Sequence, residues 1–173
     1  MIAALVLIGA PGTGKSSVLD ALGALLEREG VEHGALESEE LTRGFPALSN
    51  AILAEQLAAA LALQRSVGRR LFLVALTPES DAELQGAVAA TCAERTLVAC
   101  LRAPAEVIAA RLREREPDRW PGKEALIARA RELSGRIPAL GGIDVALDSD
   151  GCEAEELART VLAAMREGGL LAT

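Results

Sequence analysis

The feature that most constrains this chain is a run of eight residues between an apolar segment and an amphipathic one. Residues 9–16 read Gly-Ala-Pro-Gly-Thr-Gly-Lys-Ser, which completes the pattern G-x-x-x-x-G-K-[ST]. The continuous apolar run at residues 2–8 predicts a strand that is buried on both faces. The stretch after the motif has the apolar spacing of an amphipathic helix and ends at Gly30. This strand–loop–helix unit predicts an α/β fold with a phosphate-binding loop.

Each part of the motif has a chemical role. Its glycines let backbone N–H groups turn inward, and a helix that starts near Gly14 directs the positive end of its dipole to the same point. Lys15 supplies positive charge to the β- and γ-phosphates, and the Ser16 hydroxyl is a ligand for Mg²⁺. We therefore expect the chain to bind ATP and Mg²⁺. The residues predicted to hold the nucleotide are Gly9, Ala10, Pro11, Gly12, Thr13, Gly14, Lys15, Ser16 and Ser17.

The rest of the chain alternates strands and helices without a linker or an internal repeat. Its 173 residues suit one domain spanning residues 1–173. The alternation predicts a parallel sheet with right-handed crossovers, in which ligands bind at the carboxyl ends of the strands. Strands are expected at residues 2–8, 33–37, 71–76, 96–101 and 143–147, and the later helices at 46–66, 81–92, 104–116, 123–137 and 153–166.

Two carboxylates follow the second predicted strand. If the backbone stays extended there, Glu37 and Glu39 project to the same side, where one can accept a proton from a hydroxyl group and one can face Mg²⁺. Either Glu fits the role of the base, and Ser16 and Glu37 are the expected metal ligands. The alternative is that Ser38 caps a short helix whose dipole Glu39 and Glu40 complement. The third strand ends at Thr77 with no Asp, which disfavours a GTPase or a motor ATPase.

An arginine-rich segment at residues 111–129 predicts a lid over the triphosphate. At 100° per residue, Arg111 and Arg115 point within about 40° of each other on one helix, whereas Arg113 points away. Arg129 lies on the next predicted helix, across a polar loop. We expect Arg111 to bind the nucleotide, and Arg115 and Arg129 to neutralise charge during catalysis. The alternative is an ordinary solvated helix face.

A second substrate would need contacts of its own. Arg43, four residues after Glu39, is the first candidate for binding it, and Asn50 is a second. Arg102 follows the fourth strand. A role in the site and a role as an ordinary charge at the end of a strand are equally consistent with this position.

Composition excludes several classes of protein. The net charge is −7, which is unsuited to a dedicated nucleic-acid binder, and the aromatic residues are only Phe45, Phe72 and Trp120. No apolar run is long enough for a membrane span. The three cysteines and one histidine lack the spacing of a zinc site, so we expect reduced thiols in a cytoplasmic protein.

With these pieces placed, the chain resembles the nucleotide- and small-molecule-kinase branch of the phosphate-loop fold. That branch includes adenylate, shikimate, gluconate and adenylylsulfate kinases and chloramphenicol phosphotransferase. The resemblance spans the whole chain and is most specific at residues 9–16; Glu37-Ser38-Glu39, the lid arginines and residues 148–151 also carry it. The family usually has Asp-x-Asp where this chain has Glu-x-Glu. The Asp-Gly-Phe-Pro-Arg signature of adenylate kinases is absent, which disfavours a mononucleotide acceptor.

The resemblance implies a three-layer fold with strand order 2-3-1-4-5 and a short lid. It also implies an adenine site between the lid arginines and the loop after the fifth strand. We expect an ATP-dependent phosphotransferase that acts on a hydroxyl group of a small molecule, as a monomer or homodimer. The alternative is a nucleotide-binding switch or partner protein, for ATP or GTP, without transfer activity.

Overall fold

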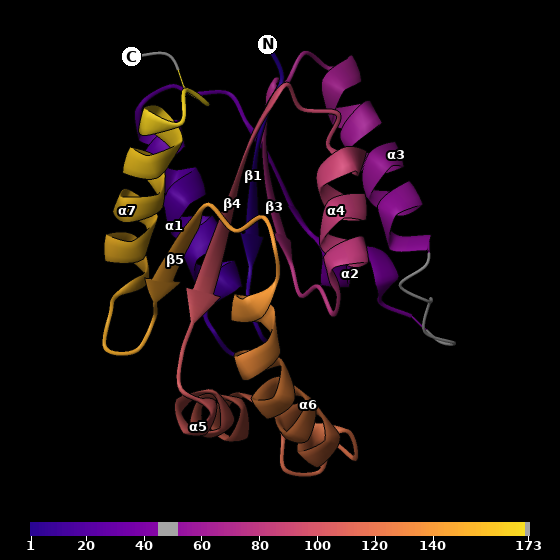
Figure 1. Cartoon of the computed structure of the whole chain (residues 1–173), viewed down its shortest axis with the longest axis vertical. Helices are drawn as coiled ribbons and strands as arrows, with labels where there is room; N and C mark the ends of the chain where they lie inside the picture. Colours follow the sequence, from indigo (N-terminus) through magenta and orange to yellow (C-terminus); the bar gives the residue numbers. More distant parts are fainter. Residues whose placement is uncertain (45–51, 172–173) are drawn as a thin grey trace.

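The computed structural model describes residues 1–44 and 52–171, and within these ranges five strands form one parallel sheet. The strand order is β2-β3-β1-β4-β5, which confirms the order that the family resemblance implied. The central strand β1 pairs with β3 on one side and with β4 on the other (Figure 1). The strands are β1 (Ala3–Ile8), β2 (Gly34–Glu37), β3 (Leu71–Leu76), β4 (Arg95–Arg102) and β5 (Val145–Asp148).

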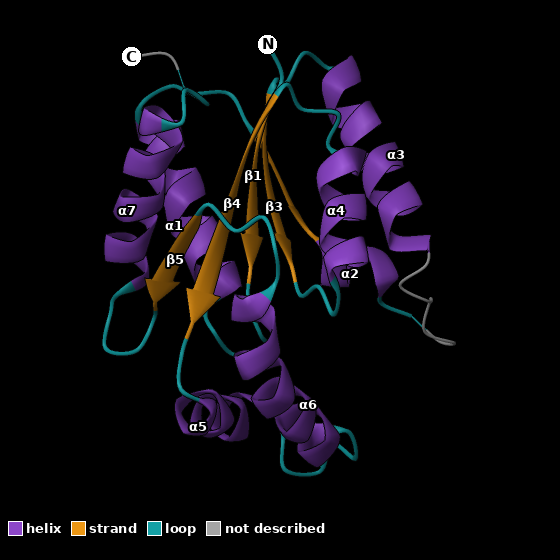
Figure 2. Ribbon diagram, in the orientation of Figure 1, coloured by secondary structure: helices purple, strands orange, loops and turns teal. Residues whose placement is uncertain are grey.

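Helices cover both faces of the sheet (Figure 2). Side chains of successive strand residues point to opposite faces, so the sheet has two cores. Leu5, Leu7 and Leu73 pack with α1 and α7, whereas Val6, Phe72 and Val74 pack with α3 and α4. The helices are α1 (Lys15–Arg28), α2 (Ser38–Thr42), α3 (Leu53–Ser66), α4 (Asp81–Ala90), α5 (Ala105–Arg115), α6 (Lys123–Arg136) and α7 (Ala154–Glu167), with a short 3₁₀ helix η2 (Ile137–Ala139) after α6.

The predicted elements are present, with differences at several boundaries. The chain turns into α2 directly after β2, so the extended backbone that we assumed beyond Glu37 is wrong. The expected helix start at residue 46 lies outside the described residues, and α3 is described from Leu53. Helix α4 ends at Ala90, before the predicted end, because Cys92 adopts the left-handed conformation (φ 49°) that often terminates a helix.

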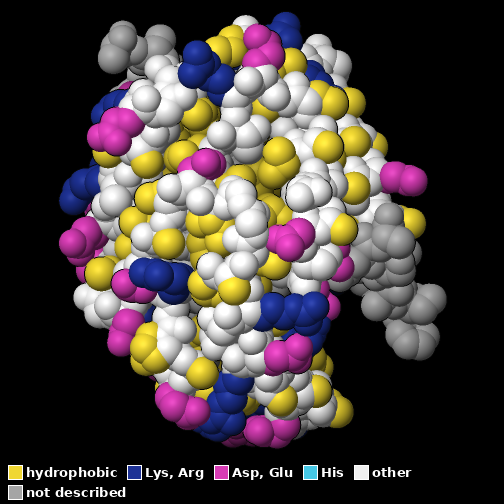
Figure 3. Space-filling model, in the orientation of Figure 1, with side chains coloured by type: hydrophobic (Ala, Val, Ile, Leu, Met, Phe, Trp, Pro, Cys, Tyr) yellow, Lys and Arg dark blue, Asp and Glu magenta, His cyan; other side chains and the backbone are white. Residues whose placement is uncertain are grey.

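The segment predicted as a lid forms the helix pair α5 and α6. In Figure 1 the strand arrows point toward these two helices, so the pair lies at the carboxyl end of the sheet. The inner faces of α5 and α6 carry Ile108, Leu112, Ile127 and Leu133, which join one of the two cores. On the face in Figure 3, side chains of both charge signs are interspersed at the end formed by these helices. Within the described ranges, no helix combines the length and apolar composition that crossing a bilayer requires.

Candidate functional site

The loop between β1 and α1 has the backbone of an anion-binding cradle. Gly12 and Gly14 have φ angles of 86° and 94°, which residues other than glycine rarely adopt. Gly9 is required for a different reason: a Cβ there would lie 2.6 Å from Thr13 Oγ1 and 2.8 Å from the Leu101 carbonyl oxygen. The loop therefore needs glycine at all three positions, and α1 begins at its end with its N-terminal amides available.

Lys15 places a buried ammonium group inside this cradle. The residue is 8% exposed, and its Nζ donates hydrogen bonds to the carbonyl oxygens of Gly9 (2.9 Å) and Ala10 (3.3 Å). Burial lowers the pKa of Lys15 from 10.5 to about 8, although the nearby Glu39 and Glu37 carboxylates oppose that change. The free protein thus holds a positive charge in a poorly solvated position, where an anionic ligand would stabilise it.

The two carboxylates after β2 lie at the same cavity, but each has a different partner. Ser16 Oγ donates a hydrogen bond to Glu37 Oε2 at 2.8 Å. Thr77 Oγ1, just after β3, lies 3.2 Å from both Glu39 Oε1 and the Gly9 carbonyl oxygen, so its single proton serves one of them at a time. The predicted cap by Ser38 is wrong, because Glu37 is the N-cap residue of α2 and no side chain caps the helix. Glu39 does lie in the first turn of α2, and its side chain also lines the cavity at the phosphate loop.

These side chains surround one small cavity of about 90 Å³. Arg115 reaches it from the last turn of α5, and its charge further lowers the pKa of Lys15. The cavity is lined by Pro11, Gly12, Gly14, Lys15, Ser16, Ser17, Glu37, Glu39 and Arg115. The structure therefore brings the predicted metal and catalytic residues together, with the exception of Arg129.

The chemistry of this cavity fits Mg²⁺. Among the described residues, no three His, Cys, Asp or Glu side chains gather as a preformed metal cage. The Ser16 hydroxyl and the Glu37 carboxylate nevertheless provide two converging oxygen atoms beside the phosphate cradle. Mg²⁺ is commonly held in this way, by one or two protein oxygens together with substrate phosphates and water.

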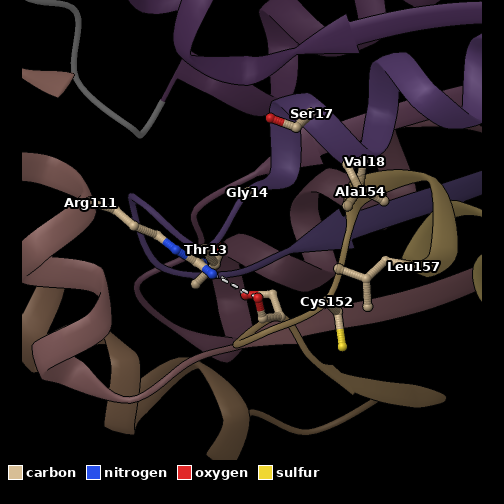
Figure 4. Close-up of a pocket in the computed structure, with 9 residues that line it drawn as sticks. Thr13, Gly14, Ser17, Val18, Arg111, Cys152, Ala154 and Leu157 are labelled. Carbon is tan, nitrogen blue, oxygen red and sulfur yellow. Dashed lines mark hydrogen bonds between the residues drawn. The ribbon is translucent and has the colours of Figure 1, made fainter. Parts of the chain in front are cut away.

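A second cavity of about 220 Å³ also adjoins the phosphate loop and shares Gly14 and Ser17 with the first. Figure 4 shows Arg111 extending toward the segment between β5 and α7, with a dashed line that marks its hydrogen bond to Ser149. Arg111 Nη2 donates to the Ser149 carbonyl oxygen at 2.7 Å, and Nη1 lies 3.4 Å from the Gly12 carbonyl oxygen. Thr13, Gly14, Ser17, Val18, Arg111, Ser149, Cys152, Ala154 and Leu157 line this cavity, which lies where the family resemblance implied the adenine site.

Other predicted site residues lie elsewhere. Arg129 binds Glu79 and Glu132 through its guanidinium group, so the structure places it away from the two cavities described above. Arg43 is exposed and forms an ion pair with Glu40 (2.8 Å). Asn50 lies outside the described residues. Arg102 pairs with Asp148 across the ends of β4 and β5 (3.1 Å).

Two contact residues were not predicted as site residues. Ser149 follows β5 in the stretch that the sequence analysis used only for the resemblance, and its position after a strand was the available signal. Glu79, the partner of Arg129, is separated from it by 50 residues, and neither residue carries a local motif that indicates the pair. Hydrogen bonding to Glu79 and Glu132 raises the pKa of Arg129.

Comparison with known proteins supports the fold. No protein-family model and no curated protein sequence matches this chain. Among solved structures, the adenylylsulfate (APS) kinase of Mycobacterium tuberculosis, in complex with AMPPNP and APS, is 20% identical and matches with a TM-score of 0.65 over 95% of this chain and 98% of that one. A gluconokinase from Sinorhizobium meliloti is 20% identical, with a TM-score of 0.63 over 95% and 92% of the two chains. Shikimate kinase from Acinetobacter baumannii, in complex with shikimate, is 18% identical, with a TM-score of 0.58 over 99% and 97%. The chain thus has the fold of small-molecule kinases of the phosphate-loop class.

Replacement of Lys15 by Met is expected to stabilise the free protein at pH 7. The folded-state pKa of Lys15, about 8, is below its ordinary value of 10.5, so the buried charge destabilises the fold below pH 8 and the penalty disappears as pH rises toward 10.5. At roughly 1.4 kcal/mol per pKa unit, the variant gains up to about 3 kcal/mol in unfolding free energy. Urea denaturation at pH 7 and at pH 10 measures the gain and its decline.

The carbonyl groups that Lys15 leaves behind retain other donors, because Thr77 lies within hydrogen-bond distance of Gly9 and Thr13 donates to Ala10. Arg159→Met, which removes an exposed positive charge on α7, is the control. A Lys15→Met protein that is less stable than wild type at pH 7, or a difference that does not change with pH, contradicts the prediction.

Proposed function

We propose that this chain transfers the γ-phosphoryl group of Mg²⁺-bound ATP to a hydroxyl group of a small molecule. The observation that carries the proposal is the convergence of Lys15, Ser16, two carboxylates and Arg115 on one cavity at the phosphate loop. Phosphoryl transfer depends mainly on positioning and on neutralising the charge of the phosphate oxygens, and these residues supply both. The matches to shikimate, gluconate and adenylylsulfate kinases support the same class of reaction.

The two carboxylates have different roles in this proposal. Glu37, hydrogen-bonded to Ser16, would hold Mg²⁺, which neutralises charge on the phosphate oxygens when bound. Glu39, beside Thr77 and exposed to solvent, accepts the proton of the acceptor hydroxyl. The acceptor oxygen forms a bond to the γ-phosphorus, the bond from that phosphorus to the bridging oxygen breaks, and ADP leaves with its electron pair.

The two arginines of α5 would contact different parts of the nucleotide. Arg111 lines the cavity next to Ser149, where the base and ribose of ATP would lie. Arg115 faces the phosphate cavity, where its guanidinium group compensates charge that increases as the phosphoryl group moves. Arg129 would have to leave Glu79 before it could take part.

A second candidate function is nucleotide binding without transfer. The observation that favours it is the contact between Thr77 and Glu39, because a phosphate-loop enzyme often has an Asp where this chain has Thr77. A screen of ADP release over hydroxylated metabolites, nucleosides and antibiotics separates the two functions. Release above the basal rate with any compound supports the kinase, whereas Mg²⁺-ATP binding with no acceptor-dependent release supports the second function.

Lys15→Met is expected to weaken the binding of Mg²⁺-AMPPNP by about 10- to 100-fold. Hydrogen bonds to charged groups contribute about 1.5–3 kcal/mol, and 1.4 kcal/mol corresponds to a factor of ten. Titration calorimetry at pH 7 measures the loss, and Arg159→Met again serves as the control. Equal affinities of Lys15→Met and the wild type would refute the nucleotide site.

Glu37→Gln and Glu39→Gln are expected to have different effects. Glu39→Gln should lower turnover about 100-fold or more at saturating Mg²⁺ while AMPPNP affinity changes little, because it removes the proton acceptor. Glu37→Gln should raise the Mg²⁺ concentration needed for half-maximal turnover, because it removes a metal ligand. Turnover is followed as ADP release with the acceptor found in the screen.

Glu32→Gln, at the opposite end of β2, is the matched control for both variants. If both Glu37→Gln and Glu39→Gln keep the full rate and the wild-type Mg²⁺ dependence, the two carboxylates only begin α2.

A further inference from the structure

Lys123 is a buried lysine that the proposed chemistry does not use. Its side chain is 9% exposed, and its ammonium group has three acceptors, which is the full number of its donors. These acceptors are the carbonyl oxygens of Arg113 (2.7 Å) and Glu116 (2.8 Å) and the carboxylate of Asp118 (2.8 Å). This contact lowers the pKa of the exposed Asp118 carboxyl group.

The place of Lys123 in its own helix is electrostatically unfavourable. It is the first residue of α6, where the helix dipole favours negative charge. The ammonium group instead binds the end of the preceding helix. Arg113 lies in the last turn of α5 and Glu116 is its C-cap residue, so neither carbonyl group has a partner within the helix. Lys123 is thus electrostatically unfavourable in its own helix, yet all the hydrogen bonds of its ammonium group go to residues that precede that helix. This indicates that Lys123 acts by joining α6 to the end of α5.

The turn that Lys123 caps also holds Arg115. The Glu116 carboxylate accepts a hydrogen bond from Arg115 Nε at 2.7 Å, and the Glu116 side chain is only 19% exposed. Lys123 thus binds the backbone carbonyl of Glu116, and the Glu116 carboxylate binds Arg115, whose side chain is 60% exposed and lines the phosphate cavity.

We propose that Lys123 is a positioning residue that holds Glu116 and, through it, directs the guanidinium group of Arg115 at the phosphate cavity. A free arginine side chain has many rotamers, and this freedom is lost when it binds a ligand. Lys123 and Glu116 restrict the Arg115 side chain already in the folded protein. Arg115 therefore loses less conformational entropy when it meets the phosphoryl group. The inference rests on the proposed function only for the identity of the group that Arg115 meets.

The first test needs no ligand. In the ¹⁵N NMR spectrum of the free protein, the Arg115 Nε–H signal is assigned by its loss in Arg115→Lys. Lys123→Met should move this signal toward that of a solvated arginine and raise its exchange rate with water at least about fivefold, because Glu116 is no longer held. Arg131→Met is the matched control, since it breaks an ion pair to Glu106 (2.8 Å) that joins the same two helices at a distance from Arg115 in the sequence.

Glu116→Gln is the second variant, in case Lys123→Met fails to fold. It retains the backbone acceptor of Lys123 but weakens the contact with Arg115. It should produce the same change in the Arg115 signal. An Arg115 signal that stays unchanged in a folded Lys123→Met protein, or in Glu116→Gln, overturns the proposal.

The second test is a double-mutant cycle with ADP, Mg²⁺ and aluminium fluoride, which mimics the phosphoryl group in transit. Lys123→Met should weaken this complex about tenfold but change ADP affinity less than twofold, and in an Arg115→Ala background it should have no further effect. Equal and additive losses in both backgrounds would show a general structural role and overturn the proposal. If the wild type binds no nucleotide, the proposed function fails, while the NMR test of the free protein still decides the role of Lys123.

Discussion

A buried positive charge at the end of the central strand is the constraint on which the rest of this structure depends. β1 lies between β3 and β4 and its side chains join both apolar cores, so the loop that follows begins at the end of a fully buried strand. Lys15 points into that loop, and burial lowers its pKa to about 8. The buried charge of Lys15 is energetically unfavourable, and backbone amide groups converge at the same position. An anion such as a phosphate group would compensate this concentration of positive charge.

The centre of this site could be predicted from sequence because its determinants are local. The strand, the glycine turn and the helix at residues 2–28 are adjacent in the chain, and each has its own pattern of residues. The alternation of later elements predicted a parallel sheet as well. The strand order could not be derived in this way, because hydrophobic periodicity shows which residues are buried but not which strands are neighbours; that order came from the family resemblance.

The arginine contacts show where the sequence was insufficient. Helix geometry predicted that Arg111 and Arg115 share a face, and in the structure they approach the phosphate loop from adjacent cavities. The same reasoning did not reveal that Arg129 binds Glu79, because a helix pattern gives a direction and not the element met there. The role of Lys123 was not predicted for a related reason, since two of its three acceptors are backbone carbonyl groups, which leave no pattern in the sequence.

These contacts make the two lid helices unequal. On α5, Arg111 is bonded to Ser149, and Arg115, whose side chain is 60% exposed, is bonded to the adjacent Glu116. On α6, Arg129 is held by Glu79 and Glu132, and any approach to the triphosphate must exchange those carboxylates for phosphate oxygens. In the proposed function, the α5 arginines would be close to the nucleotide when it binds, whereas Arg129 on α6 would first have to exchange its two carboxylates for the ligand. In the proposed function, any closure of residues 111–129 over a nucleotide would therefore depend on the contacts of α6 rather than on those of α5.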